Sequence, residues 1–338
     1  MPNQFKGLVV PAGEASPIKR RYSVTQDVVG YRRCPRQYGA FRVHNYAPAH
    51  QTQLYFGTIL HQVLDRCHGH FNGVMDSATA GTLPDNGAVL TEVAIQQYFA
   101  DIRTALDSDE TLPDPPSDMI RYFLDVEDGL KSRGIRAITP DLRLKAIRIL
   151  QYFNALEGPA LYSRVRDTEL RLQADQQSHI LHGVVDLLVE TTDNDDPSEC
   201  EIWDYKGMSR VGLLRVDIDT YLFQMRVYAH LYSLKYGVLP KRVVLYFLGE
   251  LDGDSAPTSR PANATLALDI HQGLSAEEID EAMRVFGETV TNVENSRATD
   301  NWPAAAPGEI SEKDCAICDL RWDCSTPNGG KGVAMRYP

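Results

Sequence analysis

The pattern of apolar and polar positions differs along the chain, with a helical period in some segments and short strand-like apolar runs in others. Apolar side chains recur every three to four positions in residues 56–68, 91–106 and 141–156, which predicts three helices. The last two are separated by the proline-rich stretch 112–118, which favours a loop. An all-α segment is therefore predicted between about residues 71 and 165.

Shorter apolar runs with β-branched residues follow this helical part. Residues 180–190 and 200–205 flank a turn rich in Asp, Asn and Pro, and together they predict a β-hairpin. Further strands are predicted at 168–172, 242–248 and 265–270, and helices at 220–236 and 276–293. Strands and helices in this order predict an α/β fold.

The composition is typical of a folded protein. The chain has 338 residues, of which 43% are hydrophobic, enough for one elaborated domain or two small ones. No apolar run is long enough to span a bilayer, and no apolar segment preceded by positive charge starts the chain. A cytoplasmic location is therefore expected. A P-loop motor is excluded, because no G-x-x-x-x-G-K-[S/T] sequence is present.

Charge is unevenly distributed along the chain. The net charge of −12 argues against nucleic-acid binding in general, but residues 19–45 contain seven Lys or Arg and one acid, Asp27. The same stretch contains Tyr22, Tyr31 and Tyr38, and basic residues interleaved with aromatics suit the phosphates and bases of a single strand. The alternative is that these cations pair with acids elsewhere in the fold.

The predicted hairpin carries the residues with the clearest chemistry. Asp186 is on its first strand, and Asp204 and Lys206 are two positions apart on its second. These two side chains are expected to face the same way, with Tyr205 facing the opposite side. Two carboxylates beside an ammonium can hold a divalent cation and position a water molecule against a phosphodiester. A solvated surface hairpin is the alternative.

In these residues the chain resembles the PD-(D/E)XK nuclease superfamily. Asp186 matches its first acidic position, and Asp204-Tyr205-Lys206 matches its (D/E)XK element. The resemblance implies a restriction-endonuclease-like core with a mixed central sheet flanked by helices. It also implies that Asp186, Asp204 and the carbonyl of Tyr205 hold Mg²⁺ or Mn²⁺, and that Lys206 orients or helps to deprotonate the attacking water.

Four of the six cysteines form a pattern. Cys315, Cys318 and Cys324 have the spacing C-x2-C-x5-C, and Cys34 is far upstream. Two residues between thiolates let a tight turn direct both sulfurs to one metal centre, and four thiolates can hold either zinc or an iron–sulfur cluster. A disulfide is disfavoured, because C-x2-C in a chain without an export signal more often binds metal.

One early cysteine and three late ones resemble the iron–sulfur nucleases of the RecB-like branch, which includes AddB-type and CRISPR-associated nucleases. There a [4Fe-4S] cluster joins the beginning of the chain to its end, and YRRCPRQY around Cys34 is similar to the first-cysteine motif. Gly57 and His61 match a G-x-x-x-H helix that supplies a metal ligand. Gln224 and Tyr228 match a Q-x-x-x-Y motif that contacts DNA, and their spacing places them on one helix face.

The resemblance divides the chain into five parts. They are a flexible arm (1–21), the segment with the first cluster cysteine and the His-bearing helix (22–70), a helical insertion (71–165), the nuclease core (166–300) and a cysteine-rich cluster-binding segment with its tail (301–338). The other two cysteines, Cys67 and Cys200, are expected to be ordinary buried residues.

The function that the resemblance implies is a metal-dependent DNA nuclease, an exonuclease acting on DNA ends or single strands, with a structural [4Fe-4S] cluster. DNA is then the partner, together with a separate helicase or other DNA-processing protein. Two alternatives stay open. The chain is either a catalytically silent scaffold subunit of a helicase–nuclease or integration complex, or a zinc-stapled interaction module. Glu169, before the hairpin, is a further acid that faces the ions or stays solvated.

Overall fold

A computed structural model of the protein describes residues 19–46, 52–134, 138–192, 194–270 and 272–306, together with Ile310, Cys315, residues 318–321 and Cys324. Most of the expected N-terminal arm, residues 1–18, therefore lies outside the described residues. Much of the cysteine-rich segment does so as well, although all four motif cysteines are described.

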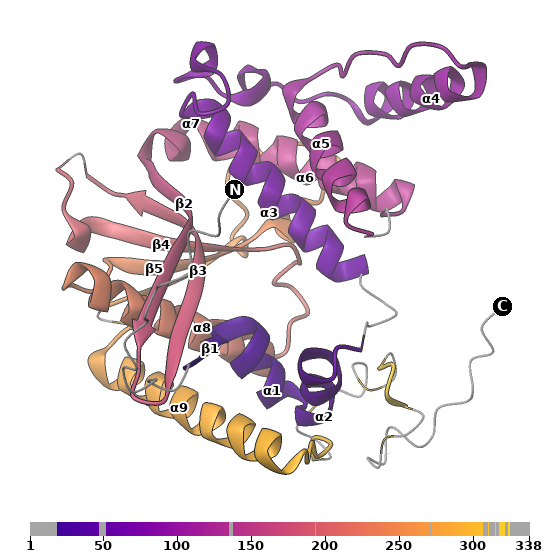
Figure 1. The fold of residues 1–338 in the computed structure, drawn as a ribbon. Coiled ribbons are helices and arrows are strands. Elements are labelled where there is room, and N and C mark those ends of the chain that lie inside the picture. The colour runs from indigo at the N-terminus through magenta and orange to yellow at the C-terminus, as the bar shows by residue number, and fades with distance from the viewer. Residues whose placement is uncertain are drawn as a thin grey trace, which may run out of the picture.

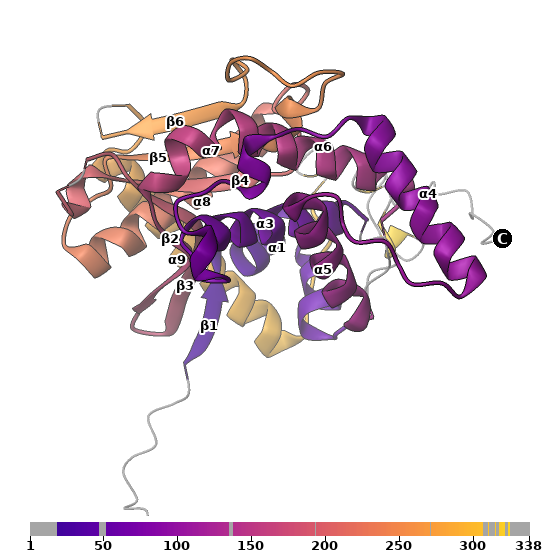
Figure 2. The ribbon, with the colours of Figure 1, turned by 90° about the horizontal axis from the view of Figure 1, so that it is seen from above.

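The described strands form one mixed six-stranded sheet (Figure 1). They are β1 (Arg20–Ser23), β2 (Val165–Asp175), β3 (His179–Glu190), β4 (Cys200–Lys206), β5 (Arg242–Phe247) and β6 (Thr265–Asp269). The strand order is β1-β3-β4-β5-β6, and β2 pairs with β3. The β1–β3 and β4–β5 pairs are parallel and the others antiparallel. Figure 2 shows β1 and β6 at the two ends of the sheet.

Helices precede, interrupt and follow the strands. The described α-helices are α1 (Gly30–Arg33), α2 (Pro35–Tyr38), α3 (Thr52–Phe71), α4 (Glu92–Ser108), α5 (Asp118–Ser132), α6 (Pro140–Leu156), α7 (Gly158–Leu161), α8 (Arg215–Tyr236) and α9 (Ala276–Thr299). Short π-helical segments at Val24–Val29 and Gly39–Val43 flank α1 and α2. The predicted helices of the insertion are confirmed as α4 and α6, and the chain adds α5 between them.

Helices cover both faces of the sheet. Leu187, Trp203 and Tyr246 belong to the core cluster beneath α3, α5 and α6, whereas Leu188 and Ile202 belong to the cluster beneath α8 and α9. Neighbouring residues of β3 and β4 thus point to opposite layers, which explains why their sequences are almost continuously apolar. Figure 1 shows α3 and α5 above the sheet and α9 below it. The expected α/β fold with a mixed sheet flanked by helices is confirmed.

The helix ends follow local signals in the sequence. Four N-cap side chains accept a hydrogen bond from the backbone N–H three residues later: Thr91 of α4, Ser117 of α5, Thr139 of α6 and Ser275 of α9. Glu278 completes a capping box at α9 by accepting from the N–H of Ser275 at 3.0 Å. Gly237 ends α8 in the left-handed region, with φ of 78°.

The first strand was not predicted. β1 begins at Arg20, inside the segment expected to be an arm, and pairs in register from Arg20–His179 to Ser23–His182. Its four residues carry no strand pattern of their own, so the exposed edge of β3 supplies the hydrogen bonds that order them. Tyr22 of this strand is buried in the core.

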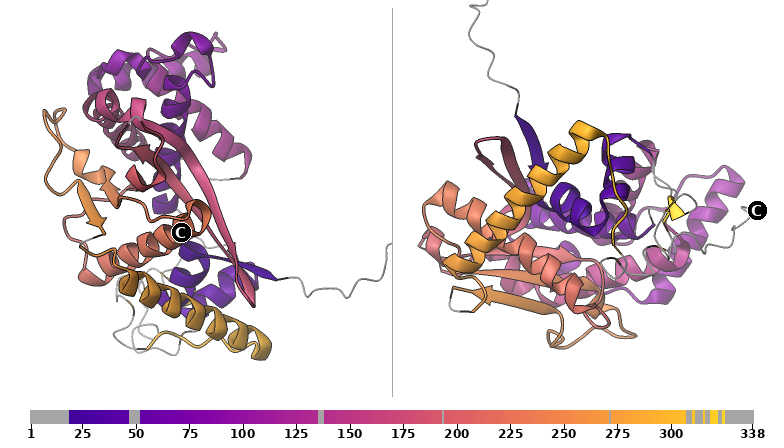
Figure 3. Two further views of the ribbon diagram at one scale, coloured as in Figure 1. Left: turned by 90° about the vertical axis from the view of Figure 1, so that its left-hand side faces the viewer. Right: turned by 90° about the horizontal axis from the view of Figure 1, so that it is seen from below.

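The chain beyond α9 returns to the N-terminal segment. Trp302 packs against the backbone of Gly39. A Cβ added to Gly39 would lie 2.3 Å from Cγ of Trp302. The Trp302 ring also lies 6.4 Å from that of Tyr31 and 5.9 Å from that of Tyr38. Figure 3 shows this segment running beside α1 and α2. In the described part of the chain, no helix is both long and apolar enough to cross a membrane.

Candidate active site and cysteine pocket

Asp186, the first acidic residue of the hairpin, lies at a fork in the sheet. β2 pairs along one edge of β3, and the other edge pairs with β1 at residues 179–182 and with β4 at residues 187–190. Neither β1 nor β4 pairs with residues 183–186 between them. Asp186 lies in this interval, and its Oδ2 accepts a hydrogen bond from the backbone N–H of Tyr205 at 2.7 Å.

Helix α3 brings a histidine to this fork. Nδ1 of His61 lies 3.4 Å from Oδ1 of Asp186. Burial alone lowers the pKa of His61, but the Asp186 carboxylate outweighs it and raises that pKa to about 9. Burial likewise opposes ionisation of Asp186, and the positive His61 reverses this, so the pKa of Asp186 falls below its usual value. A Cβ on Gly207 would lie 3.3 Å from Cα of Gly57, so the missing side chain of Gly207 suits this close approach of α3.

Strand β4, the second strand of the hairpin, presents the carboxylate of Asp204 and the ammonium of Lys206 to α8. Nζ of Lys206 lies 2.5 Å from Oδ2 of Asp204. The side chain of Gln224 joins the two groups, because its Oε1 accepts from Lys206 at 3.0 Å and its Nε2 donates to Oδ1 of Asp204 at 2.6 Å. Tyr205 points to the opposite face, where its ring packs 5.4 Å from that of Phe153. The predicted alternation of these three positions is confirmed.

Two tyrosines of α8 complete the surroundings of Lys206. The hydroxyl of Tyr228 accepts from Nε2 of Gln224 at 3.0 Å, which confirms that these two residues share a helix face. The ring of Tyr221 lies 4.8 Å from Nζ of Lys206. Tyr221 was not predicted, although its position three residues before Gln224 places it on the same side of the helix.

Burial sets the electrostatics of Asp204. Desolvation is the largest cause, and it raises the pKa of Asp204 above its usual value; Lys206 opposes the shift and Asp186 adds to it. Glu169 lies nearby on β2 in the left-handed region, with φ of 51°. Partial burial and then the charge of Asp186 raise its pKa. Glu169 is nevertheless exposed, as the solvated alternative expects.

The donor set fits a divalent cation. Among the described residues, no group of three or more His, Cys, Asp or Glu side chains already stands in metal-binding geometry. However, the contact described for the buried Oδ2 of Asp204 is its ion pair with Lys206, so this oxygen is already paired with a positive charge. A cation can satisfy such an oxygen. It would also displace the proton that His61 shares with Asp186, because a histidine ligand must be neutral.

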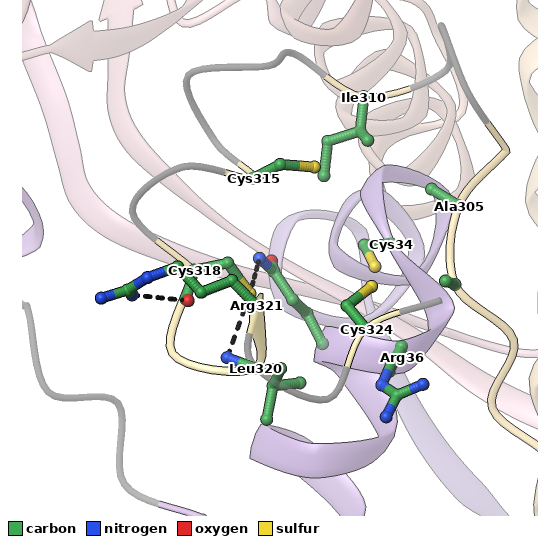
Figure 4. A pocket seen from close by; sticks show the side chains of 11 residues that line it. Cys34, Arg36, Ala305, Ile310, Cys315, Cys318, Leu320, Arg321 and Cys324 are labelled. Carbon is green, nitrogen blue, oxygen red and sulfur yellow. Dashed lines mark hydrogen bonds between the residues drawn. The ribbon is translucent and has the colours of Figure 1, made fainter. Parts of the chain in front are cut away.

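The four motif cysteines line one pocket. Cys34 stands between α1 and α2, and Cys315, Cys318 and Cys324 enter from the C-terminal segment. Figure 4 shows the sulfurs of Cys34 and Cys324 pointing toward one another, with Cys315 on the far side beside Ile310. The chain therefore gathers residues that are almost three hundred positions apart.

The pocket supplies hydrogen bonds and positive charge suited to thiolates. Sγ of Cys318 accepts from Nε2 of Gln37 at 3.1 Å and from the backbone N–H of Leu320 at 3.4 Å. Arg36 and Arg321 also line the pocket. N–H donors to sulfur are typical of metal-thiolate sites and tune the bound group. The predicted ordinary cysteines, Cys67 and Cys200, are both fully buried elsewhere, which confirms that expectation.

The basic N-terminal stretch is divided between core and surface. Arg20 pairs with Glu294 at 2.7 Å, and Lys19 contacts Asp175, as the ion-pair alternative expects. Tyr22 and Tyr38 are buried, so these two rings are not available to nucleobases. Arg32 and Arg33 of α1 are exposed, and Arg32 lies over the ring of Phe223, 5.1 Å from its centre.

Comparison with known proteins identifies a family. The model described as the PD-(D/E)XK nuclease superfamily matches residues 21–325. A solved structure titled "Crystal structure of SSO0001" is similar, with 15% sequence identity and a TM-score of 0.30, over 61% of this chain and 79% of that chain. No curated protein matches the sequence.

Proposed function

The chain belongs to the PD-(D/E)XK nuclease superfamily, and from this premise we propose that it is an Mg²⁺- or Mn²⁺-dependent deoxyribonuclease. The observation that carries the proposal is the contact of Lys206 with the buried Asp204, beside the ion pair of His61 with Asp186. Buried charged groups cost folding free energy and collect at functional sites. A solvated hairpin would have no such cluster.

Each of these residues has a role in the proposed hydrolysis. Asp186, Asp204, His61 and the carbonyl of Tyr205 would hold the metal ions, with the imidazole favouring Mn²⁺. When bound, such an ion lowers the pKa of a coordinated water and neutralises charge on the phosphate. Lys206 orients the attacking water and assists its deprotonation.

Gln224 and Tyr228 are positioning residues in this proposal. Both side chains are buried, and the Gln224 amide holds Lys206 and Asp204 at fixed positions. Tyr228 in turn fixes the orientation of that amide. They therefore act on the scissile strand through Lys206 and Asp204. Precise placement of a reacting group is a large part of catalysis.

The pocket of the four cysteines supports a structural metal centre. We assign Cys34, Cys315, Cys318 and Cys324 to a [4Fe-4S] cluster, as in the RecB-like branch, with Zn²⁺ as the alternative. The packing of Trp302 on Gly39 brings the segment after α9 against the segment that contains Cys34. A cluster would fix that arrangement, because metal binding adds folding free energy.

The expected substrate is DNA with free ends or single strands, cut as an exonuclease in the cytoplasm. The chain has no P-loop, so a separate helicase or other DNA-processing protein would supply unwound strands.

Substitution of the site tests the proposed activity. Wild-type protein should cleave labelled single- or double-stranded DNA with Mg²⁺ or Mn²⁺ and lose activity in a chelator. Asp204→Asn keeps an oxygen for Gln224 but removes the charge, and Lys206→Met removes the ammonium. Each should slow cleavage by about 100- to 10,000-fold. Lys235→Met, which replaces an exposed lysine on α8, the helix of Gln224, should leave the rate unchanged.

The same assay decides between the two functions. If folded wild-type protein binds DNA but cuts neither linear, circular nor hairpin substrates with either ion, the nuclease proposal is wrong and the scaffold function stands. Cutting of linear but not circular DNA would support the exonuclease mode.

A further inference from the structure

Four exposed apolar side chains follow Lys206 in the sequence. Met208, Val211, Leu214 and Val216 are 45%, 66%, 58% and 59% exposed. They fall within nine residues, and we refer to Met208–Val216 as the apolar segment. Single exposed apolar residues are ordinary, but a concentration of them beside a candidate active site indicates a binding surface.

The backbone of the apolar segment is held by several contacts. The exposure of its side chains is therefore not caused by a loosely held loop. The carbonyl of Met208 accepts from Gly249 N–H at 3.2 Å, and the N–H of Val211 donates to Oε1 of Glu250 at 2.9 Å. Nη1 of Arg210 donates to the carbonyl of Thr265 at 3.1 Å. A Cβ on Gly249 would lie 2.3 Å from the nitrogen of Ser209, so the two chains are in close contact there.

Tyr221 connects the apolar segment to the candidate active site. Its hydroxyl donates to Sδ of Met208 at 3.1 Å, and its ring lies 4.8 Å from Nζ of Lys206. Burial raises the pKa of Tyr221, and the neighbouring Lys206 opposes this shift. Met208, one of the exposed apolar side chains, is therefore linked through Tyr221 to Lys206.

The apolar segment also carries an exposed cation, Arg215. No acidic residue occurs from Lys206 to Val216 in the sequence, and the carboxylates of Glu250 and Asp217 that contact the segment accept from its backbone N–H groups. Arg215 is 94% exposed, and its Nε lies 3.7 Å from Oδ2 of Asp219, a loose surface pair. Such pairs contribute little and readily exchange for a phosphate.

We propose that the apolar segment binds unpaired nucleobases next to the scissile phosphate. The proposal rests on the nuclease function and specifies its substrate class as single strands or unpaired ends. In a duplex the base faces are stacked on one another, whereas an unpaired base offers an apolar face to Met208, Val211 and Leu214. A protein bound to these side chains would instead lie across the approach to Lys206.

Binding measured without turnover tests the proposal. The probes are a fluorescein-labelled oligothymidylate and a strand of the same length made of abasic sites, with Ca²⁺ in place of Mg²⁺. Val211→Ser/Leu214→Ser should weaken binding of the oligothymidylate by about 10-fold and of the abasic strand by less than about 2-fold. The salt dependence of binding should stay as in the wild type, because phosphate contacts are kept.

The control variant carries the same substitutions on a remote helix. Val93 and Leu106 of α4 are 74% and 66% exposed, and Val93→Ser/Leu106→Ser should bind both strands as the wild type does. Equal losses on both strands, or no loss on either, would overturn the proposal. No loss accompanied by a change in oligomeric state would assign the segment to protein contacts. If the wild type binds the oligothymidylate more tightly than the abasic strand but cleaves no DNA, the nuclease function is wrong and the proposed binding surface is still supported.

Discussion

His61 and His68 lie about two turns apart on α3, and their pKa values are shifted in opposite directions. The Asp186 carboxylate raises the pKa of His61 to about 9. His68 is fully buried, with its ring 4.5 Å from that of Tyr162 and Nε2 3.4 Å from the hydroxyl of Tyr205, and burial lowers its pKa to about 3. At the scale of the residue, neighbours decide the charge, because the two side chains are chemically identical.

His68 predicts a dependence of stability on acid pH. The folded state keeps His68 neutral down to about pH 3, while the unfolded chain takes up a proton below about pH 6.5. The unfolded state therefore binds more protons in this window, and the free energy of unfolding falls as the pH falls. The loss is up to about 1.4 kcal/mol per pH unit.

A substitution isolates this contribution. His68→Phe keeps an aromatic ring against Tyr162 but cannot be protonated, so its free energy of unfolding should fall less steeply between pH 6.5 and pH 4. Urea unfolding at several pH values measures both slopes, and their difference cancels the contribution of the carboxylates. Parallel slopes for variant and wild type would contradict the prediction.

At the scale of the element, close packing of α8 on β3 holds the Gln224 amide in place. Tyr228 of α8 lies directly against Gly183 of β3. A Cβ added to Gly183 would be 2.6 Å from Cε1 of Tyr228 and 3.3 Å from a methyl group of Leu231. Gly183 begins the interval of β3 that pairs with neither β1 nor β4 and that contains Asp186. The strand thus needs a residue without a side chain at this crossing.

Gly183→Ala should separate the strand from the helix. Because Tyr228 cannot move without losing its contact with Gln224, we expect a loss of about 1–3 kcal/mol in the free energy of unfolding. Gly287→Ala on α9 is the matched control. Nothing lies within 4 Å of its added Cβ, and an alanine inside a helix should raise stability by about 0.5–1 kcal/mol. Chemical denaturation measures both changes, and equal effects would refute the packing argument.

At the scale of the whole molecule, the segment around Cys34 and the segment that follows α9 meet at the cysteine pocket. Trp302 packs on Gly39, and its ring lies near those of Tyr31 and Tyr38. This apolar contact places the C-terminal segment beside Cys34 before any metal is considered. A metal centre would then link segments that are far apart in sequence, which stabilises the fold more than a short local link does.

Loss of one pocket cysteine should release the metal and destabilise the protein. In protein purified without oxygen, Cys324→Ala should lower the iron and sulfide content and the visible absorption. The midpoint of thermal unfolding should fall by about 2–4 °C for each kcal/mol lost. Cys67→Ala, which removes a buried sulfur remote from the pocket, should keep its iron. Zinc without iron in the wild type would establish the alternative metal, and no bound metal would refute the assignment.

The sequence by itself determined the local features of the protein. Alternation in β4 set which residues face which layer, because side-chain direction follows the strand period. Cap residues such as Ser275 set helix ends, and the four-residue spacing of Gln224 and Tyr228 set their shared face. These features depend on neighbours within a few positions. The boundaries were less certain, and α8 begins at Arg215 rather than near residue 220.

Only the tertiary structure decided what lies beside what. β1 has no strand pattern of its own and forms because β3 offers a free edge. The charge state of His61, the position of Tyr221 over Lys206, and the return of Trp302 to Gly39 join residues that no local pattern connects. Desolvation and packing act on whatever the fold brings together, whatever the sequence separation, and so these properties emerge only once the layers have closed.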